Sequence, residues 1–387
     1  MAMKSGSDIN RLFAHIGLFQ FGSCLAGVFF IALMLRRGVP PDMVFLAYGA
    51  IFALRFALRP LVIVLAKAVG LRGAMVAGAA LSSLQYLTLP RVEGIDGWLA
   101  AWVATAAVGD VVYWTLFHVM FAAMGDQAKL GRQNAIRQVI SAGASILGPP
   151  LGGFLLTRFD PTVAFTAAGV LRVASAFPLF DAVDPPFERQ APADAYRAGA
   201  FGALVFATDG WVICSAGLAW SMIAYLGLGE RFDTLGLALA LAGAVGALGG
   251  VALGRLVDLG HARRAVFLNL AAMSLVFAAQ AAAGRNPAMI IAAMILAALL
   301  GGLSVPSMMP AVYVALQDAP CSLRFQFATE GGWDMGAIAA ALTCAGLTAL
   351  GAPLQVAILL AIPMLFAQAW LLVAKYKSRA QSPAASD

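Results

Sequence analysis

Apolar runs long enough to cross a membrane follow one another along almost the entire chain. A membrane-spanning helix needs about 20 mostly apolar residues, and the sequence contains twelve such runs: 12–35, 43–66, 71–89, 98–124, 139–156, 163–183, 200–228, 235–257, 265–283, 288–316, 325–350 and 353–374. Only 11% of the 387 residues are charged and 61% are hydrophobic, whereas a soluble domain carries about 25% charged residues. The sequence therefore predicts an all-α integral membrane protein with twelve transmembrane helices.

One polar segment divides these runs into two sets of six. Residues 184–199, DPPFERQAPADAYRAG, contain prolines and charges that a spanning helix cannot accommodate. We therefore predict an N-terminal six-helix half at 1–183, a cytoplasmic connector at 184–199, a C-terminal six-helix half at 200–375 and a disordered cytoplasmic tail at 376–387.

The distribution of basic residues predicts how the chain crosses the membrane. With the N-terminus inside, sixteen of the 25 Lys and Arg residues fall on the side that holds both termini, and six fall on the other side. Cytoplasmic loops are enriched in Lys and Arg, so we expect both termini in the cytoplasm and the protein in the plasma membrane, specifically a bacterial inner membrane. The basic residues are spread over many short loops, which argues against a nucleic-acid partner.

The segment 254–264, GRLVDLGHARR, joins two of the apolar runs on the expected cytoplasmic side. It contains Gly254, Asp258, and the neighbouring Arg263 and Arg264. A carboxylate at a helix end can pair with basic groups or accept hydrogen bonds from the N-terminus of a neighbouring helix. We therefore predict that this segment holds the two halves together in one state and releases them in another, with Asp258 as the main gating residue.

A weaker copy of this segment lies after the second span. A shift of 191 residues aligns Lys67 and Arg72 with Asp258 and Arg263. Because Lys67 cannot act as the acceptor, we expect the gate to be asymmetric. The pattern GxLxD followed by two arginines resembles the cytoplasmic loop motif GxLxDRxGRR of the major facilitator superfamily, and this resemblance covers nearly the whole chain.

A second motif lies in the fifth span and consists of Gly148, Pro149, Pro150, Gly152 and Gly153. It is similar to the GPxxGG pattern associated in that family with proton-coupled antiporters. Glycines let a neighbouring helix approach closely, and proline removes a backbone donor and bends the helix. A helix-packing kink without a coupling role is the alternative interpretation.

The resemblance implies two six-helix halves around a central cavity lined by spans one, four, seven and ten. It also implies a secondary active transporter that moves a small organic solute by alternating access, and the antiporter-like motif implies proton-coupled efflux. The expected partners are the solute, protons and the lipid bilayer, and we expect a monomer. No catalytic residue, cofactor or metal ion is expected.

Charged and aromatic residues share one face of the fourth span. Asp110, Tyr113, Trp114 and His118 follow the spacing of neighbouring turns of a helix. A charge in the hydrocarbon costs about 2.5–3.5 kcal/mol on insertion scales, so each one is a candidate functional group. We predict that Asp110 carries a proton in a central cavity; a structural salt bridge, most plausibly with the second span, is the alternative.

Arg55 and Arg59 lie one turn apart on the second span. We expect one of them to neutralise Asp110 and the other to face an anionic group of the solute, because a guanidinium matches carboxylate or phosphate with paired donors. The alternative is that both arginines tie the second span to its neighbours. Arg172, in the sixth span, has no evident partner in the sequence.

Five further polar or aromatic residues complete the predicted site. Gln20 lies in the first span, and Asp209 and Trp211 lie in the seventh; all three could line the cavity. Glu330 and Asp334 lie one turn apart near the expected cytoplasmic end of the eleventh span, where gate pairing competes with solvation at the interface.

Two other classes of protein remain as alternatives. A lipid or lysolipid flippase on the same fold would tolerate the apolar, aromatic-rich spans. A polytopic membrane enzyme, such as a prenyl transferase, needs two Asp-rich loops for Mg²⁺ and diphosphate, but a suitable pair, Asp181 and Asp184, occurs only once. The sequence contains no HExxH, GxSxG or Walker motif, which weighs against a membrane protease, a hydrolase or an ATP-driven pump.

Overall fold

The structure is a computed structural model, which describes residues 5–124, 130–187, 190, 193–257 and 262–380. These residues form helices and connecting segments, with no strand among them. The first group of helices, here the N-terminal group, comprises α1 (Ser5–Leu25), η1 (Gly27–Phe29), α2 (Phe30–Arg36), α3 (Pro41–Leu81), α4 (Leu84–Thr88), η2 (Leu89–Arg91), α5 (Gly97–Met124), α6 (Leu130–Arg158), α7 (Pro161–Ala174) and η4 (Phe177–Leu179).

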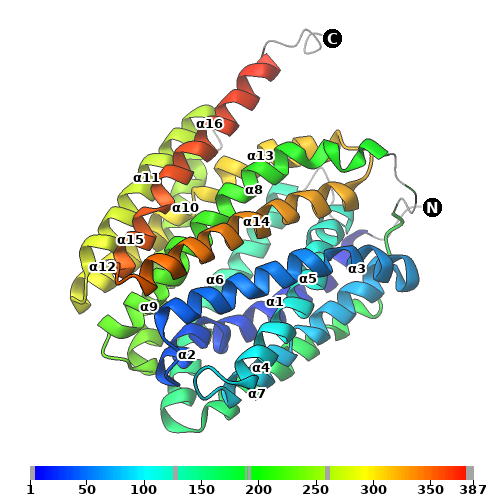
Figure 1. Ribbon diagram of the computed structural model, residues 1–387. Coiled ribbons are helices and arrows are strands. Elements are labelled where there is room, and N and C mark those ends of the chain that lie inside the picture. The colour runs from blue at the N-terminus through cyan, green and yellow to red at the C-terminus, as the bar shows by residue number, and fades with distance from the viewer. Residues whose placement is uncertain (1–4, 125–129, 188–189, 191–192, 258–261, 381–387) are drawn as a thin grey trace.

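The remaining helices, here the C-terminal group, follow the short 3₁₀ turns η5 (Ala193–Ala195) and η6 (Arg197–Gly199). They are α8 (Ala200–Val212), the π-helical segment η7 (Ile213–Gly217), α9 (Leu218–Gly227), α10 (Phe232–Val257), α11 (Ala262–Ala283), α12 (Pro287–Gly301), α13 (Ser304–Gln317), α14 (Ser322–Ala349), α15 (Leu354–Leu359) and α16 (Ala361–Ala380). Figure 1 shows the N-terminal group in blue to green and the C-terminal group in green to red.

Ten helical segments among the described residues are long and apolar enough to cross a membrane. The prediction of an all-helical, multi-pass membrane protein is therefore confirmed. One of the ten, Pro41–Arg91, contains both the second and the third predicted spans. The eleventh predicted span corresponds to α14, which is not among the ten and whose mean hydropathy is lowered by Glu330 and Asp334. The count of twelve, the side of the termini and the division into two halves remain predictions.

The second and third predicted spans, 43–66 and 71–89, are not separated by a loop. Helix α3 runs from Pro41 to Leu81, and its one break lies at Gly70, where φ is +80°. A residue with a side chain adopts this left-handed conformation only at a cost, whereas glycine adopts it freely. The glycine therefore reverses the chain within a single turn.

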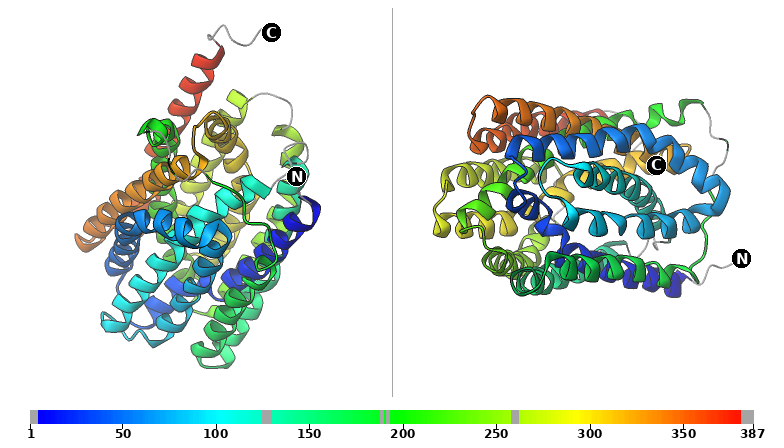
Figure 2. Two further views of the ribbon diagram at one scale, coloured as in Figure 1. Left: turned by 90° about the vertical axis from the view of Figure 1, so that its right-hand side faces the viewer. Right: turned by 60° about the horizontal axis from the view of Figure 1, so that its bottom comes forward.

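The two groups of helices meet along two long contacts. Helix α3 packs against α14, and α6 packs against α10. Figure 2 shows α3, in blue, beside α14, in orange. A smaller contact joins α2 to α9, and near it the guanidinium of Arg36 lies 5.0 Å from the ring centroid of Phe232, the first residue of α10.

Glycines bring α6 very close to its neighbours. A Cβ atom on Gly152 would overlap the carbonyl oxygen of Leu25 in α1, and one on Gly153 would overlap the carbonyl oxygen of Phe232. Gly236 of α10 approaches the carbonyl oxygen of Pro149 in the same way. The antiporter-like motif therefore lies where α6 contacts both α1 and α10, as close packing through small residues requires.

Candidate functional site

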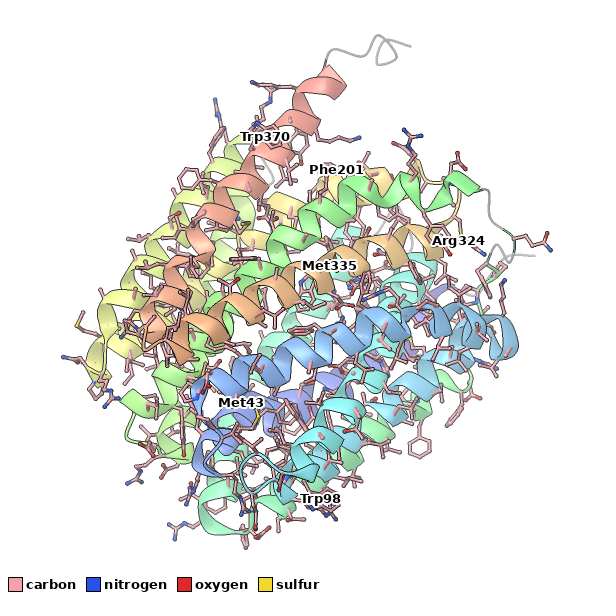
Figure 3. All side chains as sticks on the ribbon, viewed as in Figure 1. Met43, Trp98, Phe201, Arg324, Met335 and Trp370 are labelled. Carbon is pink, nitrogen blue, oxygen red and sulfur yellow. The ribbon has the colours of Figure 1, made fainter. Side chains whose placement is uncertain are left out.

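Two pairs of charged residues, each spaced by one helical turn, face each other where α3 meets α14. Arg55 and Arg59 lie on α3, and Glu330 and Asp334 lie on α14. Residues four apart project from the same face of a helix, so each helix presents two charges to the other. Figure 3 shows the two helices side by side, with Met43 marking the first turn of α3 and Met335 the residue after Asp334.

These four side chains form a buried ion cluster. Arg55 Nη2 lies 3.2 Å from Asp334 Oδ1 and 3.7 Å from Glu330 Oε2. Arg59 Nη2 forms an ion pair with Asp334 Oδ2 and also donates a hydrogen bond to the Glu330 carbonyl oxygen at 3.1 Å. The exposed fractions of the four side chains are between 0% and 7%, so the cluster is shielded from solvent.

Side chains from three helices position the two arginines. Arg59 Nη1 donates to Thr115 Oγ1 of α5 at 3.1 Å. The Arg55 guanidinium lies 5.6 Å from the ring centroid of Phe52 and 5.4 Å from that of Trp333, within the distance of a cation–π contact. Aromatic rings on both α3 and α14 therefore hold one cation in place.

His118 extends the cluster toward α5. Its Nε2 atom lies 3.8 Å from Glu330 Oε1, which makes an ion pair whenever the imidazole is protonated. We refer to Arg55, Arg59, His118, Glu330 and Asp334 together as the inter-group ion cluster. Two guanidinium groups balance two carboxylates, and removing any one of these charges would leave an unbalanced charge in a dry environment.

The predicted pairing of Asp110 with an arginine of the second span is wrong. Asp110 is half-buried, and its Oδ1 atom accepts a hydrogen bond from Gln85 Nε2 at 3.4 Å. Both arginines instead form ion pairs with acidic residues of α14. The sequence placed Asp110 in the fourth predicted span and the two arginines in the second, but the orientation of α3 turns its charged face toward α14.

The predicted polar face of α5 makes contacts in two separate places. Tyr113 is 1% exposed, and its hydroxyl lies 3.0 Å from His15 Nε2 inside the N-terminal group. Trp114 packs edge-on against Phe19. His118, one turn further along, reaches the C-terminal group. The helix thus divides its polar side chains between the interior of its own group and the inter-group ion cluster.

The remaining predicted cavity residues make hydrogen bonds within their own group of helices. Gln20 Nε2 lies 3.8 Å from Cys24 Sγ on the same helix. Trp211 Nε1 donates to the Leu360 carbonyl oxygen at 3.1 Å, between α15 and α16. Asp209 Oδ2 accepts a hydrogen bond from Trp333 Nε1 at 3.0 Å.

The predicted gate residues are only partly described. Asp258 lies outside the described residues, and Gly254 belongs to α10. Lys67 is exposed, as are Arg263 and Arg264.

Arg72 makes contacts within the N-terminal group. Its Nη1 atom donates to the carbonyl oxygens of Phe180 and Ala182, both at 2.9 Å. Its backbone N–H donates to Asp184 Oδ1 at 3.0 Å. Arg72 therefore fastens the chain that follows α7 to the turn at Gly70, which is a contact that the gate prediction did not include.

The sequence did not reveal a second buried network, which surrounds Arg172. Its Nη1 atom donates to Ser82 Oγ at 3.1 Å and its Nη2 atom to Tyr86 Oη at 3.0 Å, while its Cζ lies 3.7 Å from the Phe19 ring centroid. Each of these residues belongs to a different predicted span from Arg172, so spacing within one helix could not connect them.

The apolar helices, together with charges buried where two groups of helices meet, define a multi-pass helical membrane protein. The chain belongs to the Major Facilitator Superfamily, whose sequence profile matches residues 12–324. A search of curated proteins finds no match. Family membership supports a membrane transporter and not an enzyme.

Solved structures of transporters share the fold. The human organic anion transporter MFSD10 (TETRAN) is 16% identical, with a TM-score of 0.68 over 96% of this chain and 100% of that one. The POT family transporter PepTSo is 12% identical, with a TM-score of 0.67 over 97% and 99%. The nucleoside transporter NupG is 11% identical, with a TM-score of 0.61 over 97% and 100%. At these identities the likeness concerns the fold alone.

Proposed function

We propose that the protein is a secondary active transporter that exports a small organic solute in exchange for protons. The observation that carries this proposal is the inter-group ion cluster. Its ion pairs join α3 and α5 of the N-terminal group to α14 of the C-terminal group. A carboxylate shared between the two groups is a site where protonation changes how strongly they attract each other.

Glu330 and Asp334 are the proposed proton carriers, with Arg55 and Arg59 as their counter-ions. Protonation of Asp334 removes the negative charge that both guanidinium groups share, which weakens the contact between α3 and α14. In alternating access, one half of a transporter moves against the other around a central site. Loss of the proton restores the ion pairs and returns the halves to the conformation described here.

The two arginines are not free to bind an anionic solute in this conformation, because both are paired with acids. The solute therefore remains a small organic molecule of unassigned charge. The export direction and proton exchange are supported by the resemblance of the α6 motif to that of antiporters. The proposed setting is the plasma membrane, specifically a bacterial inner membrane, with a monomer as the working unit.

A flippase is the second candidate, and one observation favours it. A groove of about 690 Å³ lies between α1, α6 and α7 and is lined mainly by apolar residues, among them Phe21, Leu151 and Val170. An apolar groove of this size suits an acyl chain. Transport of a fluorescent lysolipid between the leaflets of a proteoliposome, without counterflow of any soluble solute, would favour this candidate over the first.

The test of proton coupling compares two modes of transport in proteoliposomes. A solute is first selected from a panel by the thermal stabilisation that it gives the purified protein. Its uptake is then measured under an imposed pH gradient and, separately, by counterflow without a gradient. We expect Glu330→Gln and Asp334→Asn to lose accumulation driven by the gradient while at least one of them retains counterflow.

Asp110→Asn is the comparison variant, because the fourth span offers the other candidate proton carrier. Retention of gradient-driven accumulation by Asp110→Asn, and its loss in the two α14 variants, is the expected pattern. The reverse pattern would assign the proton to Asp110. Equal accumulation by all three variants and the wild type would refute proton coupling at any of the three positions.

A further inference from the structure

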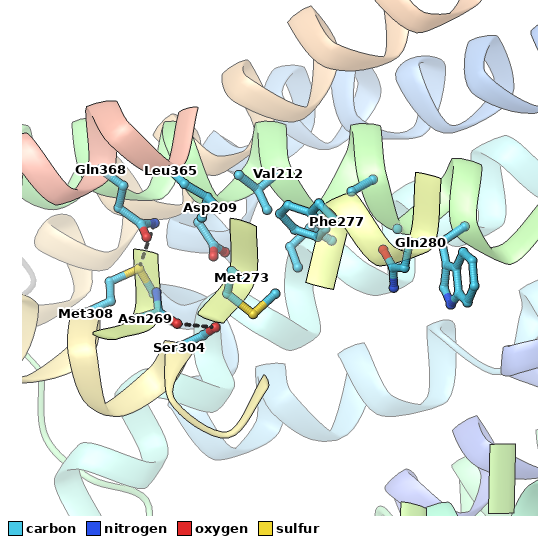
Figure 4. Close-up of a pocket in the computed structure, with 14 residues that line it drawn as sticks. Asp209, Val212, Asn269, Met273, Phe277, Gln280, Ser304, Met308, Leu365 and Gln368 are labelled. Atoms are coloured by element: carbon cyan, nitrogen blue, oxygen red, sulfur yellow. Dashed lines mark hydrogen bonds between the residues drawn. The ribbon is translucent and has the colours of Figure 1, made fainter. Parts of the chain in front are cut away.

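A cavity of about 150 Å³ lies within the C-terminal group, and none of the residues of the inter-group ion cluster lines it. Figure 4 shows that α8, α11, α13 and α16 contribute its walls. The polar residues of the lining are Asp209, Asn269, Gln280, Ser304 and Gln368. They belong to four different predicted spans, so the tertiary fold alone brings them together.

Asp209 is the one ionisable residue of the lining. Its Oδ2 atom accepts the hydrogen bond from Trp333, and within the described part of the chain no Lys, Arg or His forms an ion pair with it. Asp209 is half-buried, and a carboxylate in a largely apolar surrounding is costly unless an opposite charge compensates it. The cavity therefore presents a negative group without a protein counter-ion.

A second buried acceptor lines the same cavity. Gln280 is 5% exposed, and its Oε1 atom has no hydrogen-bond partner among the described residues. Buried polar atoms are nearly always hydrogen-bonded, so an exception calls for an unseen partner. The missing partner of Gln280 is a donor, whereas the missing partner of Asp209 is a cation. Figure 4 shows Phe277 between Asp209 and Gln280, so a ligand would present its cation to Asp209 and a separate donor to Gln280.

One wall of the cavity is the π-helical segment between α8 and α9. Ile213, Ala216 and Gly217 of this segment line the cavity, and Asp209 lies one turn before it. Single π-helical turns interrupt the regular backbone hydrogen bonds of a helix and are frequent at functional sites.

The rest of the lining is apolar and includes aromatic rings. Trp220, Met273 and Phe277 contribute to it. Sites for small organic molecules are mostly apolar with a few placed polar groups, and aromatic rings attract organic cations. A bare inorganic ion would require oxygen ligands on most sides. An engineered cavity of about 150 Å³ holds benzene, so a single-ring molecule fits.

We propose that this cavity binds a small organic ammonium ion, with Asp209 as the counter-ion of its ammonium group and Gln280 as an acceptor for a second donor elsewhere on the ligand. Trp333 positions the carboxylate by donating to its Oδ2 atom. The same indole ring faces the Arg55 guanidinium, so the occupied cavity lies next to the inter-group ion cluster. The binding site does not depend on the proposed transport activity, because binding is measured on purified protein without a membrane gradient.

The test uses three probes of equal ring size and different charge. Purified full-length protein in detergent is unfolded by heat with benzylammonium, benzyl alcohol or benzoate in mildly alkaline buffer, where the carboxylate is ionised and the amine is still protonated. We expect benzylammonium alone to raise the melting temperature in a saturable manner. Asp209→Asn should weaken its apparent affinity about tenfold or more, because a charge-assisted hydrogen bond is lost.

Two further variants complete the test. Asp8→Asn, which removes a buried carboxylate of α1 outside the cavity, should leave the benzylammonium response unchanged. Met273→Trp, which fills the cavity and keeps Asp209, should abolish the response; it also serves as the main test if Asp209→Asn does not fold. An equal response to benzyl alcohol, an equal response to sodium ions alone, or a full response in Met273→Trp would overturn the proposal.

Discussion

Arg55 of α3 and Asp334 of α14 form an ion pair between the two groups of helices, with 3.2 Å between Arg55 Nη2 and Asp334 Oδ1. The same carboxylate also pairs with Arg59. Asp334 therefore neutralises two cations at once, and its side chain is fully buried. The contact between α3 and α14 is therefore stabilised by the same acidic residue that balances the charge of the inter-group ion cluster.

Replacing Asp334 by Asn should strongly destabilise the protein. The substitution leaves Arg55 and Arg59 with Glu330 as their only acidic partner, and breaking a buried ion pair by removing one partner costs about 3–5 kcal/mol. The double variant Arg55→Gln with Asp334→Asn restores the charge balance. Its loss of stability should be smaller than the sum of the two single losses, which thermal unfolding in detergent would measure as a coupling energy.

The exposed pair Arg231 and Asp233 provides the control for this cycle. Its atoms Arg231 Nη2 and Asp233 Oδ2 lie 2.6 Å apart, but the side chains are 66% and 31% exposed. An exposed pair contributes about 0–1 kcal/mol, so the same double-mutant cycle should give a small coupling energy there. A coupling energy at Arg55 and Asp334 no larger than that of the control pair would contradict the proposed cluster.

Two glycines of α6 should respond to alanine in opposite directions. A Cβ atom at position 152 would overlap the Leu25 carbonyl oxygen, whereas one at position 143 would meet no atom within 4 Å. We expect Gly152→Ala to lower the free energy of unfolding by about 1–3 kcal/mol through overpacking. Gly143→Ala should raise it by up to about 1 kcal/mol through helix propensity. Similar melting temperatures for the two variants would mean that α1 and α6 are not in close contact.

Arg172 should not be replaceable by lysine. The guanidinium donates to Ser82 and Tyr86 from two different nitrogens and stacks on Phe19. A lysine ammonium cannot reproduce this planar, two-donor arrangement, and an unsatisfied buried hydroxyl costs about 1–3 kcal/mol. Thermal unfolding should show a clear loss for Arg172→Lys and almost none for Arg158→Lys, a matched change at an exposed residue. If both variants lose equal stability, the Arg172 network has no structural role.

The sequence predicted the features that depend on one helix at a time. The apolar runs predicted an all-helical membrane protein, and the four-residue spacing of Arg55 and Arg59 correctly predicted a shared face. The four-residue spacing of Glu330 and Asp334 likewise indicated that these two residues share one face of α14. Close packing at the α6 motif also followed from its glycines.

The features that depend on two helices could not be predicted from local patterns. The partner of Arg55 depends on how α3 and α14 pack against each other. The spacing of residues within either helix does not determine that packing. Asp110 was paired with the arginines because it is the charged residue of the fourth predicted span. The position of a charge along a span and its sign do not determine which neighbouring helix the side chain faces. The turn at Gly70 was missed for a different reason, since a single left-handed residue is too short a signal to be distinguished from a loop.

Asp160 should make the start of α7 sensitive to acid. It is the N-cap of that helix, and its Oδ1 atom accepts a hydrogen bond from the Thr162 backbone N–H at 2.8 Å. Hydrogen bonds from the side chain and the backbone of Thr162 lower the pKa of Asp160 from its ordinary value. A carboxylate whose pKa is lower in the folded state stabilises that state fully above the unfolded pKa, and this contribution is lost as the pH falls through the folded value.

Two substitutions separate the charge of Asp160 from its capping role. Asn still caps a helix but carries no charge, whereas Ala does neither. Asp160→Ala should cost about 0.5–2 kcal/mol at neutral pH, toward the lower end because the residue is exposed.

The difference in melting temperature between wild type and Asp160→Asn should be constant near neutral pH and shrink below about pH 4, near the unfolded pKa of aspartate. The difference between the Asn and Ala variants should not depend on pH. A constant difference between wild type and Asn down to acidic pH would show that the charge of Asp160 does not stabilise α7, since a carboxyl group with the same pKa in both states makes no pH-dependent contribution to stability.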